Sequence, residues 1–244
     1  MPSLLMIVPS RGRPGSLDGL IEAWRTTSTG HADLVVALDD DDPRLYQYNA
    51  HRVAMVTVGP RQSWVAWTNE IAAAHAGSYR FVGSMGDDHR PRTPGWDRML
   101  CSALEELGSG IAWGDDLGSR PVLPSAVAMT SDVVAALGYM VPPALEHNGA
   151  ETFWQGLADG LGRSRFLPEV VIEHLHYSLG KSSIDHTYLE GAGVLQADLL
   201  RLDAYLRDEL PAELERLEKL LGPGTATTAL AGPGRGASLS PLKR

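Results

Sequence analysis

The chain has 244 residues, of which 43% are hydrophobic and 21% charged, and its formal net charge is -9. This length and composition suit one main domain with appendages and a full hydrophobic core. The acidic balance argues against a protein that coats DNA or RNA, because such binding depends on lysine and arginine along the phosphates. The first apolar run, residues 4–8, is too short for a signal-peptide core or a membrane span, so we expect a cytosolic protein. The lone Cys101 is expected to be a small buried core residue.

Short apolar runs alternate with helical patterns over the first half of the chain. Strands are predicted at residues 4–8, 33–39, 54–58 and 79–83, and helices at 17–26, 63–76 and 96–107. Such alternation is typical of an α/β protein with a mostly parallel central sheet flanked by helices. Ligands bind at the carboxyl ends of the strands in sheets of this kind. Residues 39–42 and 87–88 are acidic and each follow a strand, so we expect both clusters at that one edge.

The second half of the chain ends in a charged helical region. Further strands are predicted at residues 110–114, 126–129 and 169–176, with helices at 131–137 and 151–161. Residues 191–221 carry leucines at helical spacing and form a predicted helical arm, which either covers the sheet as a satellite helix or pairs with a second copy in a homodimer. Residues 222–244 have little to bury and form a predicted flexible tail. Residues 1–190 are predicted to form the main domain.

Two groups of residues suggest a metal site. Gly86-Asp87-Asp88-His89 follows an apolar strand, where adjacent carboxylates can hold a hard cation and reach a ribose; the alternative is a polar loop that caps the next helix. His174 and His176 would point to the same side of a strand, a spacing suited to metal ligation. In the alternative, one histidine packs in the sheet and the other is exposed.

The segment at residues 81–89, Phe-Val-Gly-Ser-Met-Gly-Asp-Asp-His, resembles the Asp-x-Asp-type segment of GT-A glycosyltransferases, especially the family 2-like group. The resemblance spans residues 3–190 and implies a GT-A fold that binds a nucleoside-diphosphate sugar, most commonly a UDP-sugar. It also implies Mn²⁺ or Mg²⁺ held by Asp88, Asp87 beside the donor, and His174 or His176 as a further ligand. The motif reads Asp-Asp-His instead of Asp-x-Asp, so Asp87, Asp88 and His89 remain alternatives for the principal ligand.

The same resemblance assigns a nucleotide site. Residues 7–14, Ile-Val-Pro-Ser-Arg-Gly-Arg-Pro, are similar to the family's first strand and nucleotide-contacting loop. The donor-contacting residues that it implies are Pro9, Ser10, Arg11, Asp39, Arg61 and Asn69. Asp41 is the alternative to Asp39 as the acceptor from the base, and we expect Asp40 and Asp42 to be solvated.

A general base and a closing loop are implied further along the chain. Glu151 corresponds to the carboxylate that removes the acceptor proton in inverting members, although the usual Glu-Asp pair reads Ala150-Glu151 here. The alternative is that Glu151 only complements a helix dipole. Lys181 lies in the polar stretch 180–188, where it could neutralise a diphosphate beneath a closing lid.

Two other classes of protein remain open. A nucleotidyltransferase shares an acidic metal pair, but it usually carries a glycine-rich loop with a downstream lysine, which residues 9–14 lack. A non-catalytic nucleotide- or glycan-binding module would need neither a base nor a lid. In its short length, its Asp-Asp-His motif and its His-Leu-His element, the chain resembles small stand-alone glycosyltransferases of phages and actinobacteria. If it is phage-encoded, the location would be the host cytoplasm. The acceptor would then be a protein, a glycan or a modified nucleobase.

Overall fold

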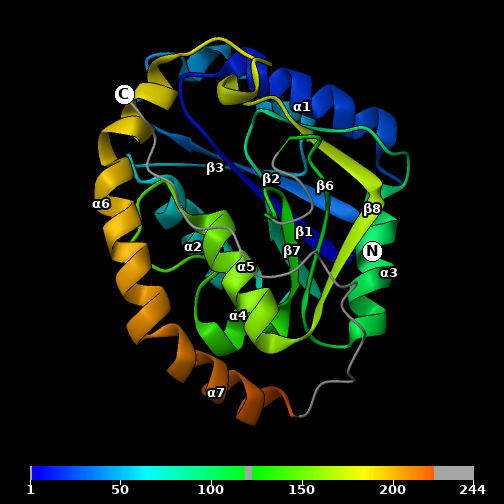
Figure 1. The fold of residues 1–244 in the computed structure, drawn as a ribbon. Coiled ribbons are helices and arrows are strands. Elements are labelled where there is room, and N and C mark those ends of the chain that lie inside the picture. Colours follow the sequence, from blue (N-terminus) through cyan, green and yellow to red (C-terminus); the bar gives the residue numbers. More distant parts are fainter. Residues whose placement is uncertain (1, 119–122, 223–244) are drawn as a thin grey trace.

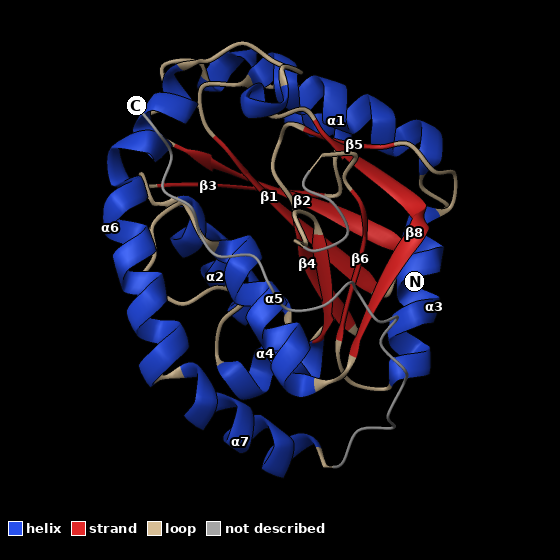
Figure 2. Ribbon diagram, in the orientation of Figure 1, coloured by secondary structure: helices blue, strands red, loops and turns tan. Residues whose placement is uncertain are grey.

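The computed structural model describes residues 2–118 and 123–222, which form a sheet with helices on both faces (Figure 1, Figure 2). The strands are β1 (Leu4–Ser10), β2 (Ala32–Asp39), β3 (Met55–Gly59), β4 (Phe81–Ser84), β5 (His89–Pro91), β6 (Ile111–Asp115), β7 (Val127–Thr130) and β8 (Ser164–His174). The α-helices are α1 (Pro14–Thr27), α2 (Trp64–His75), α3 (Trp96–Leu107), α4 (Ser131–Leu137), α5 (Ala150–Leu161), α6 (His186–Asp208) and α7 (Leu210–Leu221). Short 3-10 helices are η1 (Leu45–Gln47), η2 (Ala50–Arg52) and η3 (Tyr177–Leu179). The predicted α/β class is confirmed.

The strands lie in the order β3-β2-β1-β4-β7-β6-β8-β5. The first four are parallel, and Leu4 of β1 is the register partner of Ala32 in β2 and of Phe81 in β4. β7 is antiparallel to both β4 and β6, because the chain returns from β6 to its neighbour without a crossover helix. β8 runs parallel to β6, and β5 lies antiparallel beside it. The sheet is therefore mostly parallel, as predicted, with β7 and β5 reversed.

Strand β1 supplies apolar side chains to both faces of the sheet. Leu5 and Ile7 pack in a cluster with residues of α2, α4 and α5, while Leu4, Met6 and Val8 pack in a second cluster with residues of α1 and α3. All residues of β1 are buried. Burial on both faces explains why this strand appears in the sequence as a continuous apolar run without alternation.

The C-terminal helices α6 and α7 pack against the rest of the described chain, along the side of α5 (Figure 1). Leu202 and Tyr205 of α6 and Leu217 of α7 are buried in the same cluster as α5. The hydroxyl groups of Tyr205 and Tyr139 lie 2.7 Å apart. These contacts match the satellite-helix alternative for this region. Residues 223–244 of the predicted tail lie outside the described residues. Within residues 2–118 and 123–222, no helix combines the length and apolar character needed to cross a membrane.

Two strand assignments differ from the sequence-based predictions. β8 starts at Ser164 and ends at His174, so His176 lies beyond it and caps η3. The expectation that His174 and His176 lie on the same side of one strand was therefore wrong. β5 was not predicted, because it has only three residues and ends in Pro91. It forms because β8 offers an open edge, on which His89 becomes the register partner of His174.

Candidate functional site

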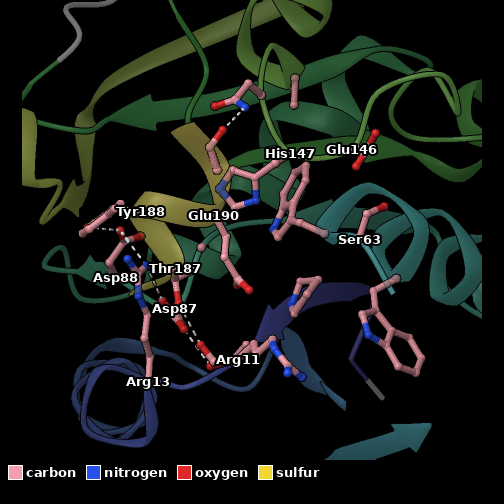
Figure 3. A pocket seen from close by; sticks show the side chains of 18 of the residues that line it. Arg11, Arg13, Ser63, Asp87, Asp88, Glu146, His147, Thr187, Tyr188 and Glu190 are labelled. Atoms are coloured by element: carbon pink, nitrogen blue, oxygen red, sulfur yellow. Dashed lines mark hydrogen bonds and ion pairs between the residues drawn. The ribbon is translucent and has the colours of Figure 1, made fainter. Parts of the chain in front are cut away.

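A pocket of about 550 Å³ opens where the ends of β1, β2 and β4 face the end of β8 and the start of α5. Most residues singled out in the sequence line it, namely Pro9, Ser10, Arg11, Asp39, Arg61, Asp87, Asp88, Glu151, His174 and His176. Figure 3 shows side chains that converge on this pocket from α6 and from the loops after β1 and β4. Both acidic clusters therefore reach one edge of the sheet, as the order of strands and helices predicts.

Asp39 is a buried carboxylate at the end of β2, and both of its oxygens accept hydrogen bonds within the protein. Its Oδ1 accepts hydrogen bonds from Trp67 Nε1 at 2.7 Å and from the backbone N–H of Gln62 at 3.2 Å. Its Oδ2 accepts from Arg11 Nη1 at 3.0 Å, and the same nitrogen also pairs with the exposed Asp41. Asp39 is thus the fixed carboxylate of this part of the pocket, and Asp41 lies at its margin.

Asp42 corrects the expectation of a solvated acidic run. Only 4% of Asp42 is exposed, and its Oδ2 accepts the backbone N–H of Gly12 at 2.6 Å and the Tyr48 hydroxyl at 3.1 Å. Gly12 has a φ of 71°, a conformation that favours glycine. Asp42 therefore fixes the loop that leaves β1, whereas Asp40 is exposed as expected.

Asp88, His89 and His174 form a cluster in which one potential ligand atom from each lies within 4.8 Å of the others. Oδ1 of Asp88 is 3.4 Å from Nδ1 of His89 and 3.4 Å from Nε2 of His174. The backbone N–H of Gly86 donates to Nδ1 of His89 at 3.0 Å and fixes that ring. His89 is 2% exposed, and its buried Nε2 has no hydrogen-bond partner among the described residues. One carboxylate with two imidazoles is a donor set suited to a divalent metal ion.

The pKa values of the adjacent carboxylates Asp87 and Asp88 are shifted in opposite directions. Burial by itself raises the pKa of Asp88, but its interactions with His174 and His89 outweigh it and hold that pKa well below its usual range. For Asp87, burial and the charge of Asp88 both raise the pKa. Asp88 therefore stays ionised, as a metal ligand must, while Asp87 protonates more readily.

Arg13, the N-cap of α1, and Tyr188 of α6 support this cluster (Figure 3). Arg13 binds both carboxylate oxygens of Asp185, the N-cap of α6, at 2.7 Å each, and its Nη1 lies 3.4 Å from Asp87 Oδ1. Its guanidinium lies 3.9 Å from the centre of the Tyr188 ring. The Tyr188 hydroxyl donates to Oδ2 of Asp88 at 2.9 Å. The start of α6 is thereby linked to the acidic motif.

Glu151 lies in the first turn of α5 and lines the pocket. The helix starts after Gly149, which has a φ of 94°. Burial raises the pKa of Glu151, with contributions in the same direction from Asp116 and Asp88, while His174 opposes the shift. A carboxylate with a raised pKa beside a cavity is a candidate general base.

The structure does not bring Asn69 and Lys181 to the pocket wall. The Oδ1 of Asn69 accepts the backbone N–H groups of Met140 and Val141 at 2.9 and 3.0 Å, so its amide holds that segment. Lys181 Nζ lies 3.0 Å from Oε1 of Glu173, which precedes His174 on β8. Side chains alternate along a strand, so this pair lies on the face away from His174.

Three pocket residues proposed from the sequence have distinct placements. His176 lines the pocket outside the three-residue cluster, with its ring centre 5.2 Å from that of His174. Arg61 Nη2 lies 2.6 Å from Oε1 of Glu190 on α6, which links the loop after β3 to that helix. Ser10 Oγ donates to Oδ2 of Asp87 at 2.6 Å.

Sequence reasoning missed Arg13, Tyr188 and Asp185. Arg13 lies within the nucleotide-loop motif, where Arg11 was taken instead. Asp185 stands three residues before Tyr188 and accepts its backbone N–H at 3.1 Å, which is N-cap geometry. That capping pattern was a usable sign that a helix, and not only a mobile lid, starts beside the pocket.

Comparison with known proteins finds similarity in structure and none in sequence. No protein-family model matches the sequence, and no curated protein matches it. Among solved structures, glucosyl-3-phosphoglycerate synthase from Mycobacterium tuberculosis, in complex with Mn²⁺, UDP and glucosyl-3-phosphoglycerate, superposes with a TM-score of 0.61 and 14% identity over 84% of this chain and 80% of that one. TarS 1-349 of S. aureus with UDP-GlcNAc gives a TM-score of 0.57 and 12% identity over 91% and 72% of the two chains.

A third similar structure is the mannosyltransferase PcManGT from Pyrobaculum calidifontis in complex with GDP-Man and Mn²⁺. Its TM-score is 0.53, with 14% identity over 90% of this chain and 74% of that chain. At these identities the likeness concerns the fold. The chain has the GT-A glycosyltransferase fold, as the motif resemblance implied.

Proposed function

We propose that this protein is a metal-dependent glycosyltransferase that moves a sugar from a nucleoside-diphosphate sugar to an acceptor hydroxyl. The observation that carries this proposal is that Asp88, His89 and His174 line one pocket together with Glu151. The structural neighbours are in complex with UDP, UDP-GlcNAc or GDP-Man, and two of them also with Mn²⁺. The proposal is supported both by the fold and by the presence of a candidate metal-binding cluster and a carboxylate in one pocket.

Mn²⁺ or Mg²⁺ would be held by Asp88, His174 and His89. The residues fit such an ion because Asp88 keeps a strongly lowered pKa and because one potential ligand atom from each of the three residues lies within 4.8 Å of the others. Two imidazoles favour Mn²⁺ over Mg²⁺, which prefers oxygen ligands. His176 lies outside this cluster and would become a ligand only after a rearrangement of the site. A bound divalent ion would stabilise the negative charge of the leaving nucleoside diphosphate.

The donor nucleotide would lie along the ends of β1 and β2. Asp39 accepts from the base, and Pro9, Ser10, Arg11 and Arg61 line the same part of the pocket. Arg11 already holds Asp39, so its guanidinium orients that carboxylate. Asp87 lies beside the donor, where Ser10 and Arg13 fix its two oxygens.

Glu151 would act as the general base that removes the proton from the acceptor hydroxyl. Its half-buried position at the pocket wall and its raised pKa support this role. Attack by a base-activated hydroxyl from the face opposite the leaving group gives inversion at the sugar carbon, and we propose that outcome here. The acceptor class stays open among a protein, a glycan and a modified nucleobase.

The experiment that tests the function is calorimetric titration with UDP, GDP, dTDP and ADP, each with and without Mn²⁺. We expect one diphosphate to bind in a Mn²⁺-dependent manner, and Asp88→Ala to abolish that binding. The corresponding sugar nucleotide should then be hydrolysed slowly in the absence of an acceptor. Binding without any turnover would favour the non-catalytic module, and release of pyrophosphate from a nucleoside triphosphate would favour the nucleotidyltransferase.

A further inference from the structure

Asp198 is a fully buried carboxylate in the middle of α6, away from the acidic motif. Its Oδ1 accepts the backbone N–H of Glu146 at 3.0 Å, and its Oδ2 accepts those of His147 and Asn148 at 3.0 and 2.8 Å. Nδ2 of Asn148 also lies 3.3 Å from Oδ2. Three successive backbone N–H groups therefore converge on one side chain that is distant in sequence.

This arrangement is a strong tether for the segment that precedes α5. Hydrogen bonds to an ionised acceptor are shorter and stronger than those between neutral groups, and successive N–H groups form a concave site for an anion. Burial alone raises the pKa of Asp198, yet the backbone donors of Asn148, His147 and Glu146 outweigh it and lower that pKa. Arg201 adds a cation 3.4 Å from Oδ1. The carboxylate therefore stays charged although it is buried.

Other residues of α6 contact the same segment closely. Nδ2 of Asn148 donates to the carbonyl of Gly191 at 2.9 Å. A Cβ atom at Gly191 would come within 2.6 Å of Cδ2 of His147, so a side chain at that point would displace the His147 ring. A Cβ atom at Gly149 would come within 2.8 Å of Cδ2 of Leu202. On both sides of Asp198, a side chain of one segment therefore packs closely against a glycine of the other.

We propose that Asp198 is a positioning residue, which fixes residues 146–149 and thereby places the first turn of α5, with Glu151, against the pocket. This inference rests on the proposed function for its catalytic consequence but not for its structural part. His147, Asn148, Gly149 and Glu151 all line the pocket, and Gly191 does so from α6. A displacement of this tether would move the general base relative to the acceptor, and misplacement by about 1 Å can cost about 100-fold in rate.

The test compares Asp198→Asn with Asp203→Asn, an exposed carboxylate on the same helix that pairs with Arg207. The amide keeps the shape of Asp198 but loses one acceptor oxygen. In Asp198→Asn we expect hydrogen exchange at the amides of residues 146–148 to accelerate by at least about tenfold, with protection in the sheet unchanged. Turnover of the sugar nucleotide should fall by about 100-fold, while the affinity for Mn²⁺ and nucleoside diphosphate stays that of the wild type. Asp203→Asn should change none of these quantities.

The two readouts separate the parts of the inference. Unchanged exchange at residues 146–148 would overturn the tether. Faster exchange with unchanged kcat would overturn the positioning role. If the wild type neither binds nor turns over any sugar nucleotide, the proposed function fails, and the exchange data still decide whether Asp198 holds the segment. If Asp198→Asn does not fold, Asn148→Ala, which removes one donor to Asp198, should show the same two effects at smaller size, and its failure to do so would count against the inference.

Discussion

His89 and His174 are register partners on the antiparallel strands β5 and β8, and their imidazole rings stack with centroids 4.1 Å apart and planes 17° apart. This pairing joins the acidic motif after β4 to the end of a strand far along the chain. Both rings face Oδ1 of Asp88 at 3.4 Å. The three-residue strand β5 thus has a specific role, because it sets the spacing of the two histidines.

The first prediction concerns the contribution of His174 to metal binding. His174→Ala should weaken Mn²⁺ affinity at least as much as the loss of an outer-shell partner does, which is about 10- to 100-fold, because it removes an imidazole from the cluster. His186→Ala is the matched control, since His186 is exposed and pairs only with Glu190 in the described chain. Calorimetry with Mn²⁺ after treatment with EDTA measures both. Equal affinities in the two variants would exclude His174 as a ligand.

Tyr188→Phe is the second prediction and removes one hydroxyl group. That hydroxyl donates to Oδ2 of Asp88, so its loss should weaken Mn²⁺ affinity by about 10- to 100-fold. The ring should stay in place because Arg13 still stacks on it. The control is Tyr46→Phe, at an exposed tyrosine. An unchanged Mn²⁺ affinity in Tyr188→Phe would show that Asp88 needs no support from α6.

The sequence allowed the sheet edge with the acidic clusters to be predicted because the signals were local. The strands β1, β2 and β4 are buried on both faces and appear as continuous apolar runs that stop at polar residues. Asp39 ends one such run, and Asp88 lies in the turn that follows another. Once strands and helices alternate, the rule that ligands bind at the carboxyl ends of the strands brings them together.

The interactions that complete the site were not predictable in the same way, since they join segments distant in sequence. Asp42 looked like one more solvated acid until the structure showed Gly12 and Tyr48 as its donors. Asp198 lies within the predicted helical arm, and nothing in its local pattern distinguishes it from the other charged residues there. Burial of these carboxylates depends on which loop meets which helix, and periodicity within one segment carries no such information.

The third prediction tests Glu151 as the base. Glu151→Gln keeps the shape of the side chain but cannot accept a proton, so kcat for sugar-nucleotide turnover should fall by about 100- to 10,000-fold. Binding of Mn²⁺ and nucleoside diphosphate should stay unchanged. Glu218→Gln, at an exposed position of α7, is the control. A kcat near that of the wild type would leave Glu151 with the helix-dipole role and remove the argument for inversion.

The last prediction concerns Asp97, a fully buried carboxylate at the start of α3 that anchors the loop after α1. It accepts hydrogen bonds from Ser28 Oγ at 2.7 Å, from the backbone N–H and the hydroxyl of Thr29 at 3.0 and 2.9 Å, and from the N–H of His31 at 2.8 Å. Burial by itself raises the pKa of Asp97, but these donors outweigh it and lower that pKa. The folded protein therefore stabilises the ionised form of Asp97 relative to the protonated form.

A folded-state pKa below the unfolded value of about 3.9 gives stability that is complete above that pH and is lost as the pH falls toward the folded value. Asp97→Asn should therefore lower the free energy of unfolding by about 1–3 kcal/mol near pH 7, where the wild-type carboxylate is charged. The difference between the two proteins should shrink as the pH is lowered toward about 3. Urea unfolding at both pH values measures it, with Asp159→Asn at an exposed position as the control. A difference that is the same at both pH values would mean that the amide loses packing or geometry, and not the charge that the donors around Asp97 recognise.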